Sequence, residues 1–202
     1  LSLGASTSII AFLEWQAVTV ADGSTTLTPG ERIELKYTLT NLASRQDSFD
    51  LSVDFVETIG WLIEAEQRPS IVINPGASAS FYIAVTAPLN AQANDVAPEI
   101  KPILISTRSG TQYEGPAYNK IMIATMYDVG LDLIAHESEI KPGAVTTITM
   151  QLTNYGNGPT SASVHLIDTP VSWTYSLRVD GVILDKPVIQ LGVSYLGGDV
   201  ED

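Results

Sequence analysis

The chain of 202 residues contains no cysteine and only ten lysine and arginine residues. These basic residues are scattered singly and form no cluster in the sequence. Without thiols, the chain has no disulfide, no thiolate metal site and no thiol nucleophile. Nucleic acid and anionic lipid surfaces attract concentrated positive charge, so the sequence predicts neither as a partner. The net charge of −13 is typical of a soluble, acidic surface.

Residues that could carry catalysis are sparse. The two histidines are His136, followed by Glu137 and Glu139, and His165 on the polar side of an expected strand. Imidazole and carboxylates bind zinc, but sequence neighbours rarely form a site without distant partners. No Gly-x-Ser-x-Gly elbow and no phosphate-binding glycine loop occur. We therefore assign no catalytic, cofactor-binding or metal residue and expect no enzyme, although a glycosidase-type carboxylate pair stays open among 23 acids.

Long apolar runs are also missing. Residues 1–13, LSLGASTSIIAFL, have no basic flank and no run near 18 apolar residues, so we expect no membrane span and no signal peptide there. The first residue is Leu1 rather than methionine, which indicates a processed or excised segment. Residues 1–8 are expected to be an extended N-terminal arm.

One pattern occurs twice along the chain. Residues 27–54, LTPGERIELKYTLTNLASRQDSFDLSVD, begin with a Pro-Gly turn and continue as two alternating segments joined by a second turn. Residues 140–167, IKPGAVTTITMQLTNYGNGPTSASVHLI, have the same plan. Aligning Pro29 with Pro142 gives an offset of 142 − 29 = 113, which also superimposes the two Leu-Thr-Asn triplets. Recurrence at a fixed spacing is typical of duplicated structural units.

The first half has the period of half-buried strands. In residues 31–41 the apolar side chains of Ile33, Leu35, Tyr37 and Leu39 are expected to face one way and the polar residues between them the other. Other strand-like segments are residues 9–20, 48–57, 71–73, 81–85, 99–107 and 118–126. The last two are expected to form a hairpin. About seven strands with no helical periodicity predict a two-sheet sandwich with almost no helix.

The second half follows the same order but is shorter. Its strand-like segments are residues 129–135, 146–154, 160–168 and 188–191. Asp180-Gly181 between apolar arms predicts a two-residue hairpin over residues 177–184. The acidic residues Asp199, Glu201 and Asp202 are interpreted as a solvated turn, and the last three strands of the first half have no counterpart before it.

A sandwich without its final strands exposes sheet edges and apolar faces. Three explanations stay open. The chain continues beyond residue 202, or the second repeat is a smaller sheet in its own right. Alternatively, a neighbouring subunit supplies the missing strand by β-augmentation, for which the apolar, terminal residues 1–20 are the candidate donor.

The repeated turn and strand pattern resembles a known family. The run of Pro-Gly, alternating strand, Thr-Asn, alternating strand and Trp, with Thr153-Asn154-Tyr155-Gly156-Asn157 as its fullest turn, is similar to bacterial and archaeal immunoglobulin-like modules. These are the alpha-galactosidase-associated and CARDB (cell-adhesion-related) modules. Residues 73–88 resemble the second Pro-Gly turn and following strand. The resemblance covers most of residues 15–126 and about half a module in residues 127–202. It implies an extracellular or envelope spacer, adhesion or assembly module.

Three residue types in this pattern have physical roles to test. Asn41 and Asn154 are expected to hydrogen-bond their own turns, and Gly156 to supply a positive φ angle. Trp61 and Trp173 are expected to fill the interior of the sandwich rather than to stack on a sugar.

The sequence therefore predicts an all-β chain of two tandem immunoglobulin-like sandwiches, residues 1–126 and residues 127–202, the second incomplete. We expect a non-enzymatic structural, spacer or assembly module of an extracellular or cell-surface protein, without cofactor. Its expected partners are other protein subunits or neighbouring domains, with surface glycans as a further candidate. The alternatives are an accessory module of a secreted carbohydrate-active enzyme and a carbohydrate-binding module.

Overall fold

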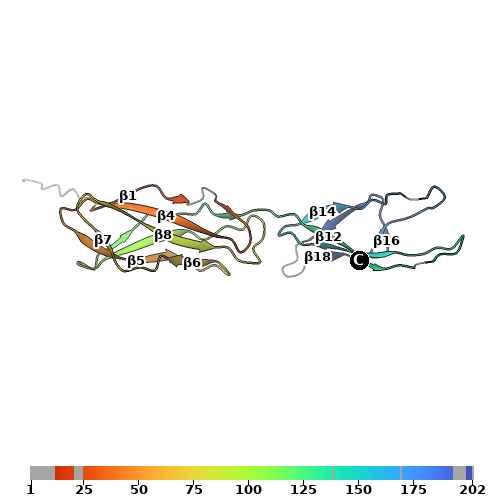
Figure 1. Ribbon diagram of the computed structural model, residues 1–202, viewed down its shortest axis with the longest axis horizontal. Helices are drawn as coiled ribbons and strands as arrows, with labels where there is room; N and C mark the ends of the chain where they lie inside the picture. Colours follow the sequence, from red (N-terminus) through yellow and green to blue (C-terminus); the bar gives the residue numbers. More distant parts are fainter. Residues whose placement is uncertain (1–11, 21–24, 138, 169, 193–198, 202) are drawn as a thin grey trace, which may run out of the picture. The chain divides into compact units, whose positions relative to one another are not determined.

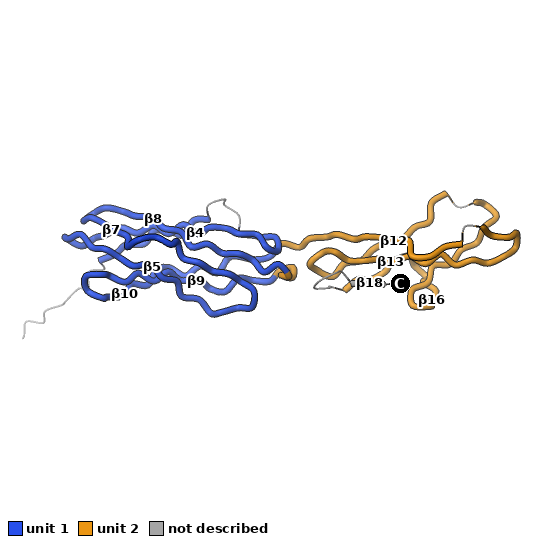
Figure 2. The backbone as a smooth tube through the Cα atoms, turned by 60° about the horizontal axis from the view of Figure 1, so that its bottom comes forward, with its two compact units in different colours: residues 1–89, 95–123 blue, residues 90–94, 124–202 orange. Residues whose placement is uncertain are grey.

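A computed structural model describes residues 12–20, 25–137, 139–168, 170–192 and 199–201. All regular elements in this part of the chain are β-strands, so the all-β prediction is confirmed. The chain divides into two compact units (Figure 2). Unit 1 consists of Leu1–Leu89 and Asp95–Ile123, and unit 2 of Asn90–Asn94 and Ala124–Asp202. The expected N-terminal arm, residues 1–8, lies outside the described residues.

Unit 1 contains two main sheets (Figure 1). The first has the order β1-β4-β8-β6, with β2 also paired to β4. Its strands are β1 Leu13–Trp15, β2 Thr19–Val20, β4 Arg32–Asn41, β6 Leu62–Ala65 and β8 Ser78–Thr86. The second has the order β10-β9-β5-β7. Its strands are β5 Asp47–Phe55, β7 Ile71–Ile73, β9 Ile100–Ser106 and β10 Gln112–Glu114.

The alternation predicted for residues 31–41 is confirmed in β4. Ile33, Leu35, Tyr37 and Leu39 are buried, because alternate side chains of a strand point to the same face. The neighbouring strand β8 contributes apolar partners directly opposite, including Phe81 opposite Tyr37. Burying a large side chain of this kind stabilises the fold by about 1.5–3 kcal/mol.

An aromatic cluster that the sequence did not reveal lies on this face. Tyr37 and Phe81 are stacked with ring centroids 5.6 Å apart. Trp15 of β1 meets both rings edge-on, at 6.5 Å and 6.0 Å. In this chain β1 pairs with β4 of its own unit.

The hairpin expected for residues 99–107 and 118–126 is present only as one antiparallel bridge, between Ile100 and Tyr118, and not as a strand pair. The antiparallel partner of β9 is β10, Gln112–Glu114, because the chain turns at Gly110, which has a φ of 68°. Residues of the second segment instead form β11, Met122–Ile123, which pairs in parallel with β3, Thr26–Leu27. This pairing joins residues 26–27 to the last residues of unit 1.

Unit 2 contains a three-stranded sheet, β12-β13-β18, and two two-stranded pairs, β14-β17 and β15-β16 (Figure 1). The strands are β12 Val129–Ala135, β13 Thr149–Asn154, β14 Thr160–Ser163, β15 Arg178–Val179, β16 Val182–Ile183, β17 Val188–Leu191 and β18 Asp199–Glu201. The hairpin at Asp180-Gly181 is confirmed, with φ angles of 50° and 77°. Such positive pairs are typical of type I′ turns. The turn expected at Asp199 is instead the strand β18, which pairs with β13.

Candidate functional site

Asn41, at the end of β4, joins the two sheets of unit 1. Its side chain is buried and makes three hydrogen bonds. Nδ2 donates to the carbonyl oxygens of Arg45 and Ile73, each at 3.0 Å, and Oδ1 accepts from the Ala43 amide at 2.9 Å. The Ala43 contact is the turn bond predicted from the sequence. The Ile73 contact reaches β7 in the opposite sheet, so one amide group fixes both the turn and the sheet pair.

Asn154 has the same environment in unit 2. Its buried Nδ2 donates to the carbonyl oxygens of Gly158 at 3.0 Å and Gly192 at 2.7 Å, and its Oδ1 accepts from the Gly156 amide at 2.9 Å. Adding 113 to positions 41, 43 and 45 gives 154, 156 and 158. We call each set of three hydrogen bonds an asparagine clasp.

Gly156 is not required for a positive φ, and that prediction is wrong. Its φ lies outside the left-handed region, as the corresponding Ala43 in unit 1 already suggests. A Cβ at position 156 would instead collide with the carbonyl oxygen of Met126 and lie 3.1 Å from Oδ1 of Asn154. Close approach of backbone explains this glycine.

The strand pairs that follow the clasps also correspond, but their outer edges differ. Asp47 of β5 lies opposite Ile73 of β7, and Thr160 of β14 lies opposite Leu191 of β17, with 47 + 113 = 160. The other edge of β5 pairs with β9 over seven residues. In the described residues of unit 2, β14 pairs with β17 alone.

Unit 2 leaves much of its apolar side uncovered. Its buried cluster consists of Leu152, Ile189 and Leu191. Leu131 lies directly opposite Leu152 and therefore shares its face, yet it is 53% exposed; Leu133, on the same face, is 57% exposed. This face of β12, together with the free edge of β14, is the candidate interaction surface of the molecule.

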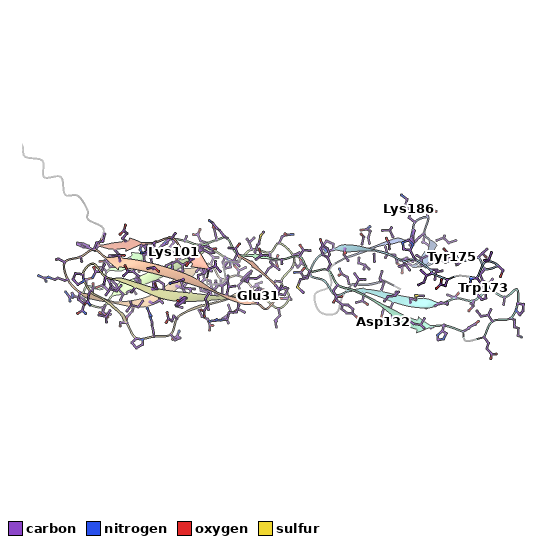
Figure 3. The ribbon with its side chains drawn as sticks, turned by 45° about the horizontal axis from the view of Figure 1, so that its top comes forward. Glu31, Lys101, Asp132, Trp173, Tyr175 and Lys186 are labelled. Atoms are coloured by element: carbon purple, nitrogen blue, oxygen red, sulfur yellow. The ribbon has the colours of Figure 1, made fainter. Side chains whose placement is uncertain are left out.

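The expected roles of Trp61 and Trp173 are not supported. Trp61 is partly buried, and Trp173 is 56% exposed. In unit 1 the ring that packs against the aromatic core is Trp15. Trp173 and Tyr175, 64% exposed, lie on the connection between β14 and β15 (Figure 3). Both rings are exposed, so neither fills the interior of unit 2.

The histidines are both exposed, as predicted for His165. Among the residues that the structure describes, no group of three or more His, Cys, Asp or Glu side chains is arranged to hold a metal ion. The pair His136 and Glu137 is therefore not extended by distant ligands, although Glu137 accepts a hydrogen bond from Thr146 Oγ1 at 3.1 Å.

One small cavity of about 170 Å³ lies beside the turn between β4 and β5 in unit 1. Arg45 and Arg108 are among its lining residues, and both are exposed. Asp47 is engaged elsewhere, since it accepts hydrogen bonds from Ser106 Oγ and the Ser48 amide, each at 2.8 Å.

Among the described residues, three side chains have a shifted pKa, and all three lie in unit 1. Hydrogen bonds from the amide and then the hydroxyl of Thr28 lower the pKa of the exposed Glu31. Burial raises the pKa of Tyr37, with a smaller contribution from Tyr118, and burial also raises the pKa of Tyr118. Glu31 lies at a turn and the two tyrosines in the interior, so these shifts report on folding rather than on a reactive cleft.

Comparisons with known proteins give only distant similarity. No protein-family model and no curated protein match the chain. A FixG-related protein from Vibrio parahaemolyticus is 12% identical, with a TM-score of 0.41 over 55% of this chain and 97% of that one. Spo0M, a sporulation control protein from Bacillus subtilis, is 10% identical, with a TM-score of 0.38 over 74% of this chain and 69% of that one.

A third similar structure is the secreted serine protease VesC from Vibrio cholerae. It is 13% identical, with a TM-score of 0.35, over 87% of this chain and 43% of that one. In the described part of the chain, no helix has the length and apolar character needed to cross a membrane.

Proposed function

We propose that this chain consists of two copies of one immunoglobulin-like module of the CARDB or alpha-galactosidase-associated type. The observation that carries this proposal is the asparagine clasp. A buried asparagine that bonds its own turn and the opposite strand pair occurs at Asn41 and again at Asn154, with the offset of the sequence repeat. A buried side-chain amide with three hydrogen bonds needs all its partners in defined positions. The same arrangement in both units therefore favours duplication over chance.

We propose that these modules act as a non-enzymatic spacer or assembly part of an extracellular or cell-envelope protein. Tandem β-modules suit this role because each one has its own buried cluster. The uncovered face and edge of unit 2 supply a surface for neighbouring domains or subunits. The acidic composition, with a pI of about 4.3, suits contact with solvent.

The location is tested on intact cells of the source organism. Antibodies raised against unit 1 are expected to label intact cells as strongly as permeabilised ones, whereas antibodies against a cytoplasmic marker label only the permeabilised cells. Labelling of unit 1 that requires permeabilisation would contradict the proposal.

A carbohydrate-binding module is the second candidate, and it is favoured by Trp173 and Tyr175. Both rings are more than half exposed and two residues apart, and flat exposed rings provide stacking surfaces for ligands. Trp173→Ala is expected to abolish glycan-array binding without a change in thermal unfolding. Val171→Ala is the matched control, since Val171 is fully exposed on the same segment. Absence of glycan binding by the unaltered chain would refute this candidate.

A further inference from the structure

Basic side chains are scarce in this chain, yet two of them line the same cavity in unit 1. The chain has ten lysine and arginine residues against 23 acidic ones. Arg45, in the turn between β4 and β5, and Arg108, in the turn between β9 and β10, both line the cavity of about 170 Å³. Asp47 is the single acidic residue in its lining. The lining of this cavity therefore has an excess of positive charge on a strongly acidic molecule.

Within the described part of the chain, neither of these two guanidinium groups has a hydrogen-bond or ion-pair partner. The ion pairs there belong to three other basic residues, Arg32, Arg68 and Lys101. Asp47 does not neutralise either arginine, because Ser106 Oγ donates to one of its carboxylate oxygens and the Ser48 amide to the other. The cavity therefore presents two guanidinium groups whose donors are available to an added anion.

The backbone of both turns is held in place. Asn41 Nδ2 donates to the Arg45 carbonyl at 3.0 Å, so the asparagine clasp of unit 1 fixes the first turn. In the second turn the Gly110 amide donates to the Ser106 carbonyl at 2.8 Å. Ser106 Oγ donates in turn to Asp47, the first residue of β5, which ties the second turn to the end of the first. A ligand would have to order only the two arginine side chains, which limits the entropy lost on binding.

The other side of the cavity is apolar and aromatic. Its lining includes Leu13 of β1 and Phe49 of β5, both buried, and Tyr113 of β10, which is partly buried. The rings of Phe49 and Tyr113 meet edge-on with centroids 6.0 Å apart. Apolar walls combined with a few polar groups are typical of small-molecule sites. The volume of about 170 Å³ is below the roughly 300–1,000 Å³ of drug-sized sites, so it suits only a small ligand.

We propose that this cavity binds a small organic carboxylate, with the carboxylate group at Arg45 and Arg108 and the apolar body toward Tyr113. Guanidinium groups match carboxylates because two parallel N–H donors meet two oxygens. Inorganic phosphate offers the charge but no apolar group, so it would leave the aromatic side of the cavity unused. This inference goes beyond the spacer or assembly role proposed above and does not depend on it.

Titration of the 202-residue chain with sodium benzoate, followed by NMR of the backbone amides at constant ionic strength, tests the proposal. Benzoate is expected to bind with a dissociation constant of about 1 mM and to shift the amides of Arg45, Gln46 and Arg108. Benzamide has the same ring without the charge, and acetate has the same charge without the ring. Each should bind at least about tenfold more weakly than benzoate, and so should inorganic phosphate.

Two variants test the arginines. Arg45→Gln and Arg108→Gln each remove one charge from the cavity, and both side chains are exposed, so thermal unfolding should stay close to that of the unaltered chain. Each variant should weaken benzoate binding by about five- to tenfold, the effect of losing a charge-assisted hydrogen bond that is partly open to solvent. Arg178→Gln is the matched control, because Arg178 is exposed in unit 2 and the change in net charge is the same. It should bind benzoate like the unaltered chain.

Three outcomes would overturn the inference. The first is the absence of a saturable shift with benzoate up to about 20 mM, well above the expected dissociation constant. The second is binding of acetate, benzamide or phosphate as tight as that of benzoate. The third is equal benzoate binding by Arg45→Gln, Arg108→Gln and Arg178→Gln. Each of these outcomes leaves the surface-labelling test of the proposed function untouched, because that test does not involve the cavity.

Discussion

Replacing Asn41 with aspartate tests the asparagine clasp of unit 1, because the substitution changes only the side-chain amide to a carboxyl group. The variant Asn41→Asp keeps an oxygen for the Ala43 amide but loses both donated bonds, to Arg45 and Ile73. At pH 7 it places a negative charge, in a position that is 1% exposed, 3.0 Å from two carbonyl oxygens. Two buried acceptors left without donors cost about 1–3 kcal/mol each.

We therefore expect Asn41→Asp to lower the free energy of unfolding of unit 1 by about 3–5 kcal/mol at pH 7. For a domain near this size, the corresponding fall in melting temperature is roughly 10–20 °C. The new carboxyl has a folded-state pKa above its ordinary value, because burial and the facing carbonyls disfavour the charge. When protonated it donates one bond, so the loss of stability should shrink between pH 7 and pH 4.

Thermal unfolding followed by circular dichroism, with hydrogen exchange of peptides from β4 and β5, measures this effect. Asn119→Asp is the matched control, since Asn119 is exposed in the same unit and the charge change is identical. Asn154→Asp should reproduce the result in unit 2. A stability of Asn41→Asp within about 1 kcal/mol of the control, or a loss that is equal at pH 7 and pH 4, would refute the role assigned to the clasp.

Two further predictions concern titration in unit 1. Burial raises the pKa of Tyr37, so the stability that it contributes is fully present below the unfolded value of about 10 and is lost as pH rises above it. At pH 7 the free energy of unfolding of Tyr37→Phe should differ little from that of the unaltered chain, because only the 3.5 Å hydrogen bond to the Ile100 carbonyl is lost. In urea titrations from pH 8 to 11.5, the variant should lose less stability than the unaltered chain as pH rises. A difference in stability that is constant with pH would contradict this. Thr28→Val removes the hydroxyl donor to Glu31 but keeps the amide donor, so NMR titration should give Glu31 a pKa between that of the unaltered chain and the ordinary 4.5. An unchanged pKa of Glu31, or a full return to 4.5, would contradict the division of the pKa shift between the amide and the hydroxyl of Thr28.

The strands with strict alternation could be predicted from the sequence because one buried face decides them. Ile33, Leu35, Tyr37 and Leu39 show this in β4, and the Asp180-Gly181 hairpin follows from local turn chemistry in the same way. The partner of β9 could not be predicted, since strand pairing is a long-range property and residues 118–126 looked as strand-like as residues 112–114.

The asparagine clasp was half visible in the sequence. The bond to the turn is local, so Asn41 and Asn154 carried that signal. The bond to the opposite sheet joins residues 32 positions apart in unit 1 and 38 in unit 2, and only the fold brings them together. The burial of Trp173 was predicted wrongly for a related reason. Its place in the internal repeat does not determine whether its ring is buried, because the strands that would cover it differ between the two units.

The parallel pairing of β3 with β11 has a mechanical consequence. Thr26–Leu27 enters from the N-terminal side of unit 1 and Met122–Ile123 leaves on the C-terminal side, and the two run in the same direction. Tension that pulls β3 toward its N-terminal end and β11 toward its C-terminal end therefore loads their hydrogen bonds together, in shear, rather than one after another. The buried side chains of Leu27 and Ile123 resist the same sliding. Within unit 1, this parallel pair therefore resists tension along the strand direction more strongly than a pair whose hydrogen bonds open one at a time.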